Sequence, residues 1–251
     1  MVGHTQKNDC ERNAAKRLCA AVHTNYPELD IILVEDALHA NAPHLRQITG
    51  YGWKFVVNVK PDSHESLFQQ FAGRLSRGDV SRLEQVTPDG VRHLYTWTSH
   101  LCLNDSAVDV AVNFLQYEEI SRDGKSRTWT WATNLPLTKR TVERVMRAGR
   151  SRWKIENETF NTLKNQGYHC EHNYGHGAQQ LATNLALLMF LAFLVDQVQQ
   201  RGCKTFQRLR QGLGSKTKLW EALRSAFQML TFSAMENLFR HIALVYRIQL
   251  E

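Results

Sequence analysis

The spacing of apolar and polar positions predicts an α/β region at the start of the chain. Apolar residues recur at helical spacing from the capping residue Asp9 through Val22. Two short runs rich in β-branched residues follow, 30–36 and 53–60, and a short helical stretch, 43–49, lies between them. A strand, a helix and a strand at this spacing predict a βαβ unit with two buried strands.

Further along, the pattern changes to alternation of apolar and polar residues. Segments 93–103, 108–117 and 127–133 alternate in this way, and a turn is predicted at Asp123-Gly124 before the last of them. Alternation with a period of two is typical of strands with one buried face. We therefore expect an antiparallel β insert.

Beyond Pro136 the helical spacing returns and persists. The segment 200–218, rich in Gly, Lys, Arg and Gln, has the composition of a linker. The apolar run 185–195 is about half as long as the roughly 20 residues that span a bilayer, so it predicts a buried helix and no membrane anchor. The predicted helices cover 141–149, 153–164, 179–199, 219–230 and 233–246.

Composition narrows the class of protein. The chain has 251 residues, 43% of them hydrophobic and 22% charged, which excludes disordered, collagenous and low-complexity proteins. Five scattered cysteines and no secretory leader argue against a disulfide framework and favour a reducing cytoplasm. A packed globular protein follows.

The net positive charge of the chain favours nucleic acid as its partner. The 31 Lys and Arg exceed the 24 Asp and Glu, for a net charge of +7. Residues 139–164 hold eight of the basic residues and three acids, a local charge of +5 beside Trp153. The plain alternative is a solvated helix face on which pairs such as Arg152 and Glu156 form ordinary ion pairs. The basic residues that we expect to contact DNA phosphates are Arg144, Arg147, Arg150, Arg152, Lys154 and Lys164.

Two sets of residues could carry chemistry. Asp36 ends the first predicted strand, where a buried strand delivers an acid at its carboxyl edge. The run His169-Cys170-Glu171-His172, with His176, has side chains that suit zinc but lacks the paired spacing of structural zinc sites. A zinc-dependent hydrolase built on 169–176 is therefore the weakest alternative.

The residues around Glu156 resemble a known family, the bacterial insertion-sequence transposases of the DDE type. The resemblance extends from about residue 7 to the C-terminus. Upstream it includes Val34-Glu-Asp36-Ala-Leu-His-Ala40, Lys60-Pro-Asp-Ser-His64 and Asp9-Cys-Glu11. Its most specific part is Arg152-Trp-Lys-Ile-Glu156 with Phe160 and Leu163-Lys164, then Gly167-Tyr168, Glu171-His172-Asn173 and Gly175-His176-Gly177.

This resemblance implies an RNase H-like fold and metal-dependent phosphoryl transfer on DNA. Asp36 matches the second aspartate of the family and Glu156 its helical glutamate, and together they would hold Mg²⁺ or Mn²⁺. Arg152 and Lys164 match the basic residues that flank the glutamate. The 119 residues between the two acids include the β insert, as in members with an insertion domain.

Three departures from the family pattern matter. Lys164 lies one residue further from Glu156 than is usual, which leaves Glu158 as a rival for the glutamate. Gly149 stands where the family has a tyrosine. The strand that carries the first aspartate would precede the Asp9 helix, and none is seen there. We therefore expect an N-terminally truncated transposase, inactive alone, and the alternative is a non-catalytic DNA-binding remnant or an inhibitor of the full-length enzyme.

The expected fold class is α/β, with a partial RNase H-like core, an antiparallel β insert and a helical C-terminal part. The expected partners are DNA, as transposon ends and target, and a second copy in a homodimer, with no membrane. The expected location is the bacterial cytoplasm at the nucleoid. The expected domains are the partial core 1–60, the β-rich insertion 61–135, the catalytic and core helices 136–200 and the C-terminal helices 201–251.

Overall fold

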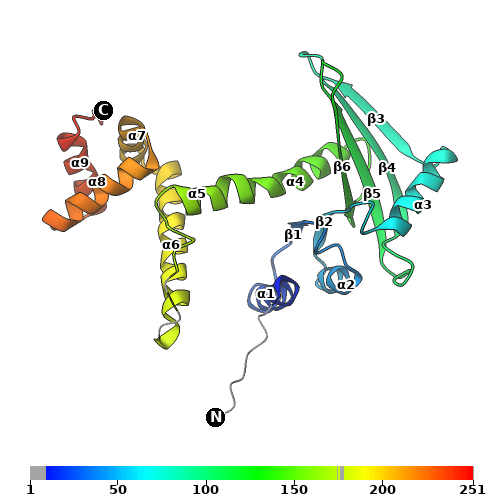
Figure 1. Cartoon of the computed structure of the whole chain (residues 1–251), viewed down its shortest axis with the longest axis horizontal. Coiled ribbons are helices and arrows are strands. Elements are labelled where there is room, and N and C mark those ends of the chain that lie inside the picture. Colours follow the sequence, from blue (N-terminus) through cyan, green and yellow to red (C-terminus); the bar gives the residue numbers. More distant parts are fainter. Residues whose placement is uncertain (1–9, 174, 176–177, 251) are drawn as a thin grey trace, which may run out of the picture. The chain divides into compact units, whose positions relative to one another are not determined.

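The computed structural model describes residues 10–173, 175 and 178–250 (Figure 1). The chain divides into two compact units, Met1–Trp153 and Lys154–Glu251. We call the first the sheet unit and the second the helical unit.

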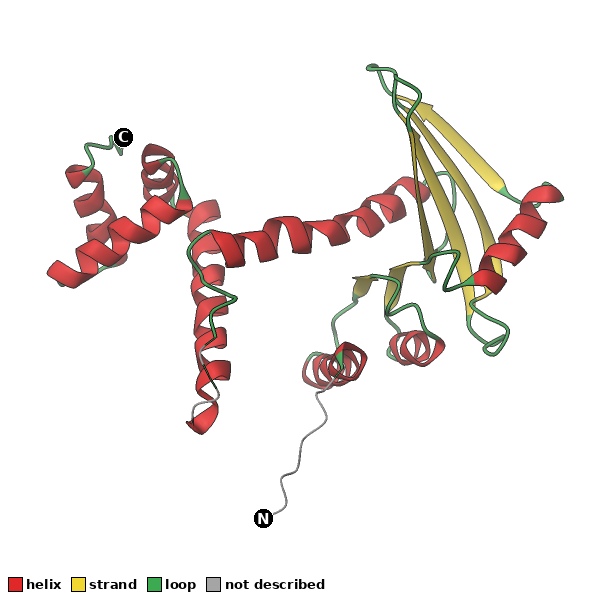
Figure 2. Ribbon diagram, viewed as in Figure 1, coloured by secondary structure: helices red, strands yellow, loops and turns green. Residues whose placement is uncertain are grey.

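The sheet unit contains one open sheet of six strands in the order β1-β2-β6-β5-β4-β3 (Figure 2). Strands β1 and β2 are parallel, and all other neighbours are antiparallel. The antiparallel strands thus continue the sheet that begins with the βαβ unit, and the predicted α/β class is confirmed. The strands are β1 Ile32–Glu35, β2 Lys54–Asn58, β3 Ser81–Val86, β4 Arg92–Cys102, β5 Ala111–Ile120 and β6 Ser126–Thr133.

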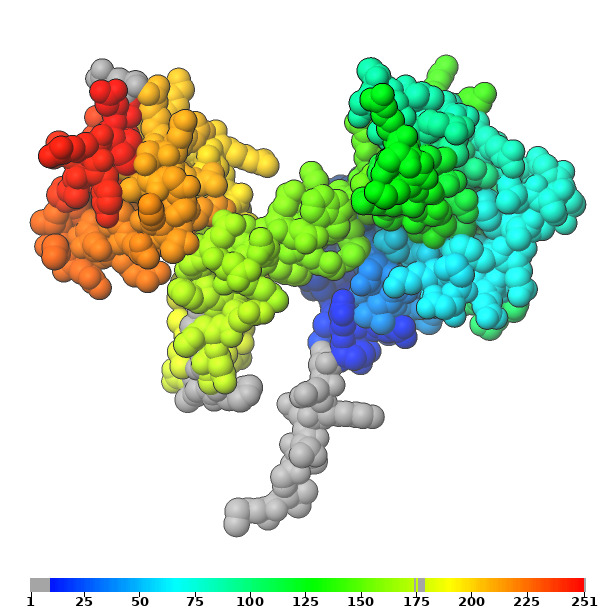
Figure 3. Space-filling model, turned by 45° about the horizontal axis from the view of Figure 1, so that its top comes forward, coloured from blue at the N-terminus to red at the C-terminus, as the bar shows by residue number. Residues whose placement is uncertain are grey.

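Helices α1 (Glu11–Asn25), α2 (Ala42–Gly50) and α3 (Glu65–Ser76) pack in one core with one face of the sheet. That core includes Leu45 of α2 and Phe114 of β5, both fully buried. The space-filling view shows the residues of the sheet unit, blue to green, packed closely against one another (Figure 3). The sequence did not predict α3 or β3.

The other face of the sheet packs against α4 (Val142–Lys154). Successive side chains of β2 lie on opposite faces of the sheet. Phe55 and Val57 pack in the core with α1 to α3, whereas Val56 packs in the core with α4. Strand β1 lies at the sheet edge and Ile32 is 51% exposed, so the prediction of a buried first strand is wrong. An edge strand has a neighbour on one side only.

Helix α4 is followed directly by a π-helical segment, Ile155–Phe160, and by α5 (Asn161–Asn165). The break predicted between residues 149 and 153 is therefore wrong. The helical unit continues with a 3₁₀ turn at Ala178–Gln180, α6 (Leu181–Gly202), α7 (Lys204–Leu213), α8 (Lys216–Met229) and α9 (Met235–Val245).

Helices α7, α8 and α9 share a core of their own, in which Leu209 of α7 is fully buried with Phe239 of α9. The prediction of a linker over 200–218 is therefore wrong. Phe206, Leu209 and Leu213 recur three and four residues apart, so one face of α7 is apolar although its composition is polar.

Helix α6 is the helix that the apolar run 185–195 predicts, but its burial is not as predicted. Met189 is its buried residue, whereas Leu187, Leu191 and Leu194 are more than half exposed. Among the described helices, α6 is long and apolar enough to cross a membrane by length and composition alone, and none of its most apolar window is buried.

Candidate functional site

Asp36 lies immediately after β1, at the carboxyl end of the edge strand. Its side-chain Oδ1 accepts a hydrogen bond from the backbone N–H of Leu38 at 2.9 Å, and its own carbonyl accepts from the N–H of His39 at 3.2 Å. An aspartate often starts a turn in this way. The sequence prediction of an acid delivered at the carboxyl end of this strand is confirmed.

Alternation along β1 indicates which face of the sheet Asp36 belongs to. Leu33 packs with the core of α1 to α3, and Val34 packs with the core of α4. Since side chains of an extended chain alternate between faces, Asp36 falls on the α4 side and Glu35 on the opposite side.

Glu156 belongs to the helical unit, as the second residue of the π-helical segment. Its rival Glu158 lies in the same segment, and both side chains are exposed. π-helical turns are rare and occur frequently at functional sites because they shift the side chains that follow. The apolar residues that follow α4 differ in burial: Leu163 is buried, whereas Ile155 and Phe160 are exposed.

The predicted phosphate-binding residues differ in what they contact. Arg150 donates to Glu119 on β5 at 3.0 Å, and its guanidinium stacks 4.5 Å from the ring centre of Trp129 on β6. Burial raises the pKa of Glu119, but hydrogen bonds from Tyr117 and Arg150 outweigh it and leave that pKa below its ordinary value. Arg150 therefore joins α4 to the sheet.

Other members of the set face solvent. Arg144 is exposed, and exposed Arg147 pairs with Glu143 one turn earlier on α4. In the helical unit Lys154 is exposed, and Lys164 pairs with Glu171 at 2.7 Å, which raises the pKa of Lys164. Surface pairs of this kind are weak, and a phosphate can compete for them.

Arg152 lines a pocket of about 290 Å³ between α4 and the sheet. Asn58, Arg150 and three tryptophans complete its lining: Trp129 and Trp131 of β6 and Trp153 of α4. The indole Nε1 of Trp131 is buried there and has no hydrogen-bond partner in the described structure. Aromatic faces and guanidinium groups together suit contact with nucleic acid.

Trp131 also accounts for Gly149, which stands where the resemblance expects a tyrosine. A Cβ atom at Gly149 would lie 2.4 Å from Nε1 of Trp131. No side chain fits at this distance, because the indole already fills the space beneath α4. The departure is therefore a packing requirement of this chain.

The residues proposed for a zinc hydrolase do not form a metal cluster as far as the structure describes them. Glu171 pairs with Lys164, and His169 and His172 are exposed. His176 lies outside the described residues.

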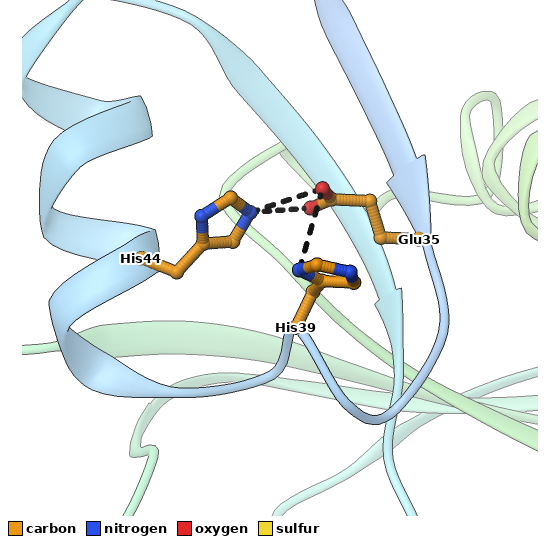
Figure 4. Close-up of side chains that lie close together, drawn as sticks. All are labelled: Glu35, His39 and His44. Atoms are coloured by element: carbon orange, nitrogen blue, oxygen red, sulfur yellow. Dashed lines mark hydrogen bonds and ion pairs between the residues drawn. The ribbon is translucent and has the colours of Figure 1, made fainter. Parts of the chain in front are cut away.

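A different cluster was missed by the sequence reasoning. Glu35 at the end of β1, His39 in the following loop and His44 of α2 place one ligand atom each within 4.8 Å of one another (Figure 4). It is the one such group of three among the residues that the structure describes. Glu35 and His39 are four residues apart, but such spacing in a loop carries little signal from sequence alone.

Comparison with known proteins identifies the family. A family model described as "Transposase DDE domain" matches residues 1–194, which include Asp36, Glu156 and all of the basic segment 139–164. A search among curated proteins gave no match. Since the family model matches well over half of the 251 residues, the chain belongs to the transposase DDE domain family.

Proposed function

We propose that this chain contributes to metal-dependent phosphoryl transfer at transposon ends, with Asp36 and Glu156 as two of the metal-holding acids of the transposase. The observation that carries the proposal is the position of Asp36 at the carboxyl end of β1, where alternation along the strand puts it on the side of Val34 and α4. The family match spans both acids and supports the same assignment.

The donor set suits the cation that this family uses. Asp36 and Glu156 offer carboxylate oxygens, which Mg²⁺ and Mn²⁺ prefer. Such ions activate the attacking oxygen and stabilise the leaving oxygen in phosphoryl transfer. The backbone N–H of Leu38 restrains Asp36 by binding Oδ1, so the carboxylate is oriented before DNA arrives.

The basic residues would hold the DNA backbone. Arg144, Arg147 and Lys154 are exposed, and Arg152 lines the pocket beside Trp153. Phosphate contacts position DNA without reading its sequence, so these residues would contribute affinity and register. DNA at the transposon ends and at the target, and a second copy of the chain, are the partners that we propose, in the bacterial cytoplasm at the nucleoid.

The second candidate is a non-catalytic DNA-binding protein that inhibits an intact enzyme. It rests on the resemblance, which matches Asp36 and Glu156 to two of the family's acids and matches none of the described residues to the first. A first aspartate on a strand upstream of α1 remains a prediction from the resemblance. The two candidates differ in cleavage and agree in DNA binding.

A nicking assay separates them. The 251-residue chain and a version extended by the upstream coding sequence are incubated with Mg²⁺ and supercoiled DNA that carries the element's ends. We expect DNA binding by both and cleavage only by the extended version. Asp36→Asn and Glu156→Gln should each lower the rate of that cleavage by about a hundredfold or more. The reason is that a reacting group held out of position slows a reaction by about this factor.

Glu158→Gln is the matched control, since it removes a carboxylate from the same exposed segment. Cleavage by the Asp36→Asn variant at the normal rate would refute the assignment. Cleavage by the 251-residue chain itself would show that it contains the remaining acid. DNA binding by both versions with cleavage by neither would favour the non-catalytic candidate.

A further inference from the structure

The cluster of Glu35, His39 and His44 is buried on one side of the sheet. The side chains are 15%, 9% and 6% exposed, respectively. His44 Nε2 lies 2.9 Å from Glu35 Oε2 and 3.0 Å from Oε1. His39 Nδ1 lies 4.0 Å from Glu35 Oε1, too far for a hydrogen bond.

The local structure fixes all three side chains. Asn41 caps α2 by accepting a hydrogen bond from the backbone N–H of His44 at 3.1 Å. The loop that carries His39 is anchored at its next residue, where the carbonyl of Ala40 is 2.9 Å from Nε2 of His64. Strand β1 holds Glu35 through its pairing with β2. The cluster is therefore preorganised.

The orientation of His39 is the unusual feature. Its Nε2 faces Glu11 of α1 at 3.3 Å, whereas its buried Nδ1 has no hydrogen-bond partner in the described structure. When Nε2 donates to Glu11, Nδ1 presents a lone pair towards the Glu35 carboxylate. Two electron-rich groups face each other in a buried space, and a cation between them removes the repulsion.

We propose that Glu35, His39 and His44 bind a divalent transition metal such as Zn²⁺, at a site separate from the acids that act in phosphoryl transfer. Two imidazoles and one carboxylate are a frequent zinc ligand set. Ligands at about 2.0–2.1 Å from a tetrahedral zinc ion lie about 3.3 Å apart. The distances of 2.9 and 4.0 Å fall on either side of this value.

Glu11 completes the arrangement from outside the cluster. A histidine that binds a metal through one ring nitrogen usually gives its other N–H to a carboxylate or carbonyl, which fixes the ring. Glu11 is placed to accept the Nε2 proton of His39. The ion would thereby join β1, the following loop and the start of α2, with α1 attached through Glu11.

The site lies on the opposite side of the sheet from Asp36. By the alternation of side chains along β1, Glu35 shares a face with Leu33, which packs towards α1 to α3. Asp36 shares the other face with Val34, which packs towards α4. The ligand types also differ, because imidazole favours Zn²⁺ and oxygen-only sites favour Mg²⁺. Zinc binding here is thus independent of the proposed catalytic role of Asp36 and Glu156.

Calorimetric titration of the full chain with Zn²⁺ in excess Mg²⁺ tests the proposal. We expect about one equivalent of Zn²⁺ to bind. Glu35→Gln, His39→Gln and His44→Gln should each weaken the affinity by more than about a hundredfold. Glu11→Gln should weaken it by about 10–100-fold, the usual cost of losing an outer hydrogen-bond partner.

His93→Gln is the matched control, because His93 of β4 is also partly buried and hydrogen-bonded, to Tyr117, but lies away from the cluster. It should retain zinc affinity, as should Asp36→Asn with Glu156→Gln. X-ray absorption of the unmutated zinc-bound chain avoids any question of variant folding. We expect its spectrum to show two imidazoles and one carboxylate.

Three results would overturn the proposal. One is that the chain binds no stoichiometric Zn²⁺, in which case the cluster is held only by the hydrogen bonds between His44 and Glu35. Another is full zinc affinity in folded Glu35→Gln and His44→Gln variants. The third is an absorption spectrum with fewer than two imidazole ligands.

Discussion

The sheet unit and the helical unit differ in what covers their apolar side chains. In the sheet unit, helices pack on both faces of the sheet, and strands of modest hydrophobicity such as Lys54–Asn58 are buried. In the helical unit, α7 to α9 form a closed core, but α6 exposes most of its apolar residues. The most apolar run of the chain is thus less buried than a strand that begins with lysine.

This difference shows that burial depends on the surfaces available to an element and not on its hydrophobicity alone. Val56 is fully buried because α4 covers its face of the sheet. Leu191 is 55% exposed because it lines an open groove between α6 and α8 and is not part of a closed core. The stability of the sheet unit should therefore depend on its core much more strongly than that of the helical unit depends on α6.

A matched pair of leucines gives the largest expected effect. Leu45→Ala removes a fully buried side chain of the sheet unit and should lower the free energy of unfolding by about 2–5 kcal/mol. Leu191→Ala on α6 should change it by less than about 0.5 kcal/mol. Urea unfolding followed by circular dichroism measures both, and equal losses in the two variants would remove the contrast.

Gly149 tests how tightly α4 packs on the sheet. Gly149→Ala should destabilise the protein by about 1–3 kcal/mol, because the new methyl group would overlap the indole of Trp131. Gly50→Ala is the control: it is also a helical glycine, but its Cβ would meet nothing within 4 Å. Gly50→Ala should stabilise by up to about 1 kcal/mol. A neutral Gly149→Ala would disprove the tight packing.

The basic face of α4 should bind duplex DNA in a salt-dependent way. Replacing Arg144, Arg147 and Arg150 by Ala should reduce the slope of log affinity against log salt by about 0.9 for each phosphate that the variant no longer neutralises. Fluorescence anisotropy across a salt series measures this slope. The control is Arg240→Ala, which removes an exposed arginine of the helical unit. An unchanged slope in the triple variant would make this surface an ordinary solvated face.

Among these three arginines, Arg150→Ala distinguishes a role in DNA binding from a role in packing α4 on the sheet. Arg150 pairs with Glu119 and stacks on Trp129, so its loss should also lower stability. Arg144→Ala should alter the salt slope without changing the urea midpoint, because Arg144 is exposed. Equal stability of both variants would argue that Arg150 does not join α4 to the sheet.

The smallest expected effect concerns Asp196 of α6, whose carboxylate accepts a hydrogen bond from Tyr168. Burial raises the pKa of Asp196 above its ordinary 3.8, although Tyr168, Lys216 and Arg210 oppose the shift. A raised pKa in the folded state adds stability below pH 3.8 that is lost as pH rises through the folded value.

Asp196→Asn should therefore gain stability relative to the unmutated chain as the pH is raised above 3.8. Urea unfolding at a series of pH values measures the difference. Glu221→Gln, at an exposed position of α8, should show no such trend. A pH-independent difference between Asp196→Asn and the unmutated chain would contradict a raised pKa.

Patterns local in the sequence predicted much of the fold. Alternation located β4 to β6, and β-branched runs located β1 and β2, so the position of Asp36 after a strand followed directly. Helices α3 and α7 also have apolar residues at helical spacing, but the polar composition of these segments obscured the pattern. Leu67 and Phe71 mark the buried face of α3, and Phe206 with Leu209 marks that of α7.

Features that depend on tertiary structure were not predictable in this way. Glu35, His39 and His44 converge only because β1, its loop and α2 fold together. The need for Gly149 depends on Trp131, 18 residues earlier and on another element. The exposure of Ile32 follows from strand order, because β1 lies at the edge of the sheet. Periodicity reports which face is apolar, but it does not report which surface covers that face.

The central claim is that Asp36 and Glu156 hold the divalent cation used in phosphoryl transfer, and Mn²⁺ binding tests it most directly. Electron paramagnetic resonance of free Mn²⁺ during titration gives the affinity for the chain and its variants. We expect weak binding, lost in Asp36→Asn and in Glu156→Gln, and retained in Glu158→Gln and Glu35→Gln. Tight Mn²⁺ binding that survives in a variant with Asp36→Asn, Glu156→Gln and Glu35→Gln together would contradict the account.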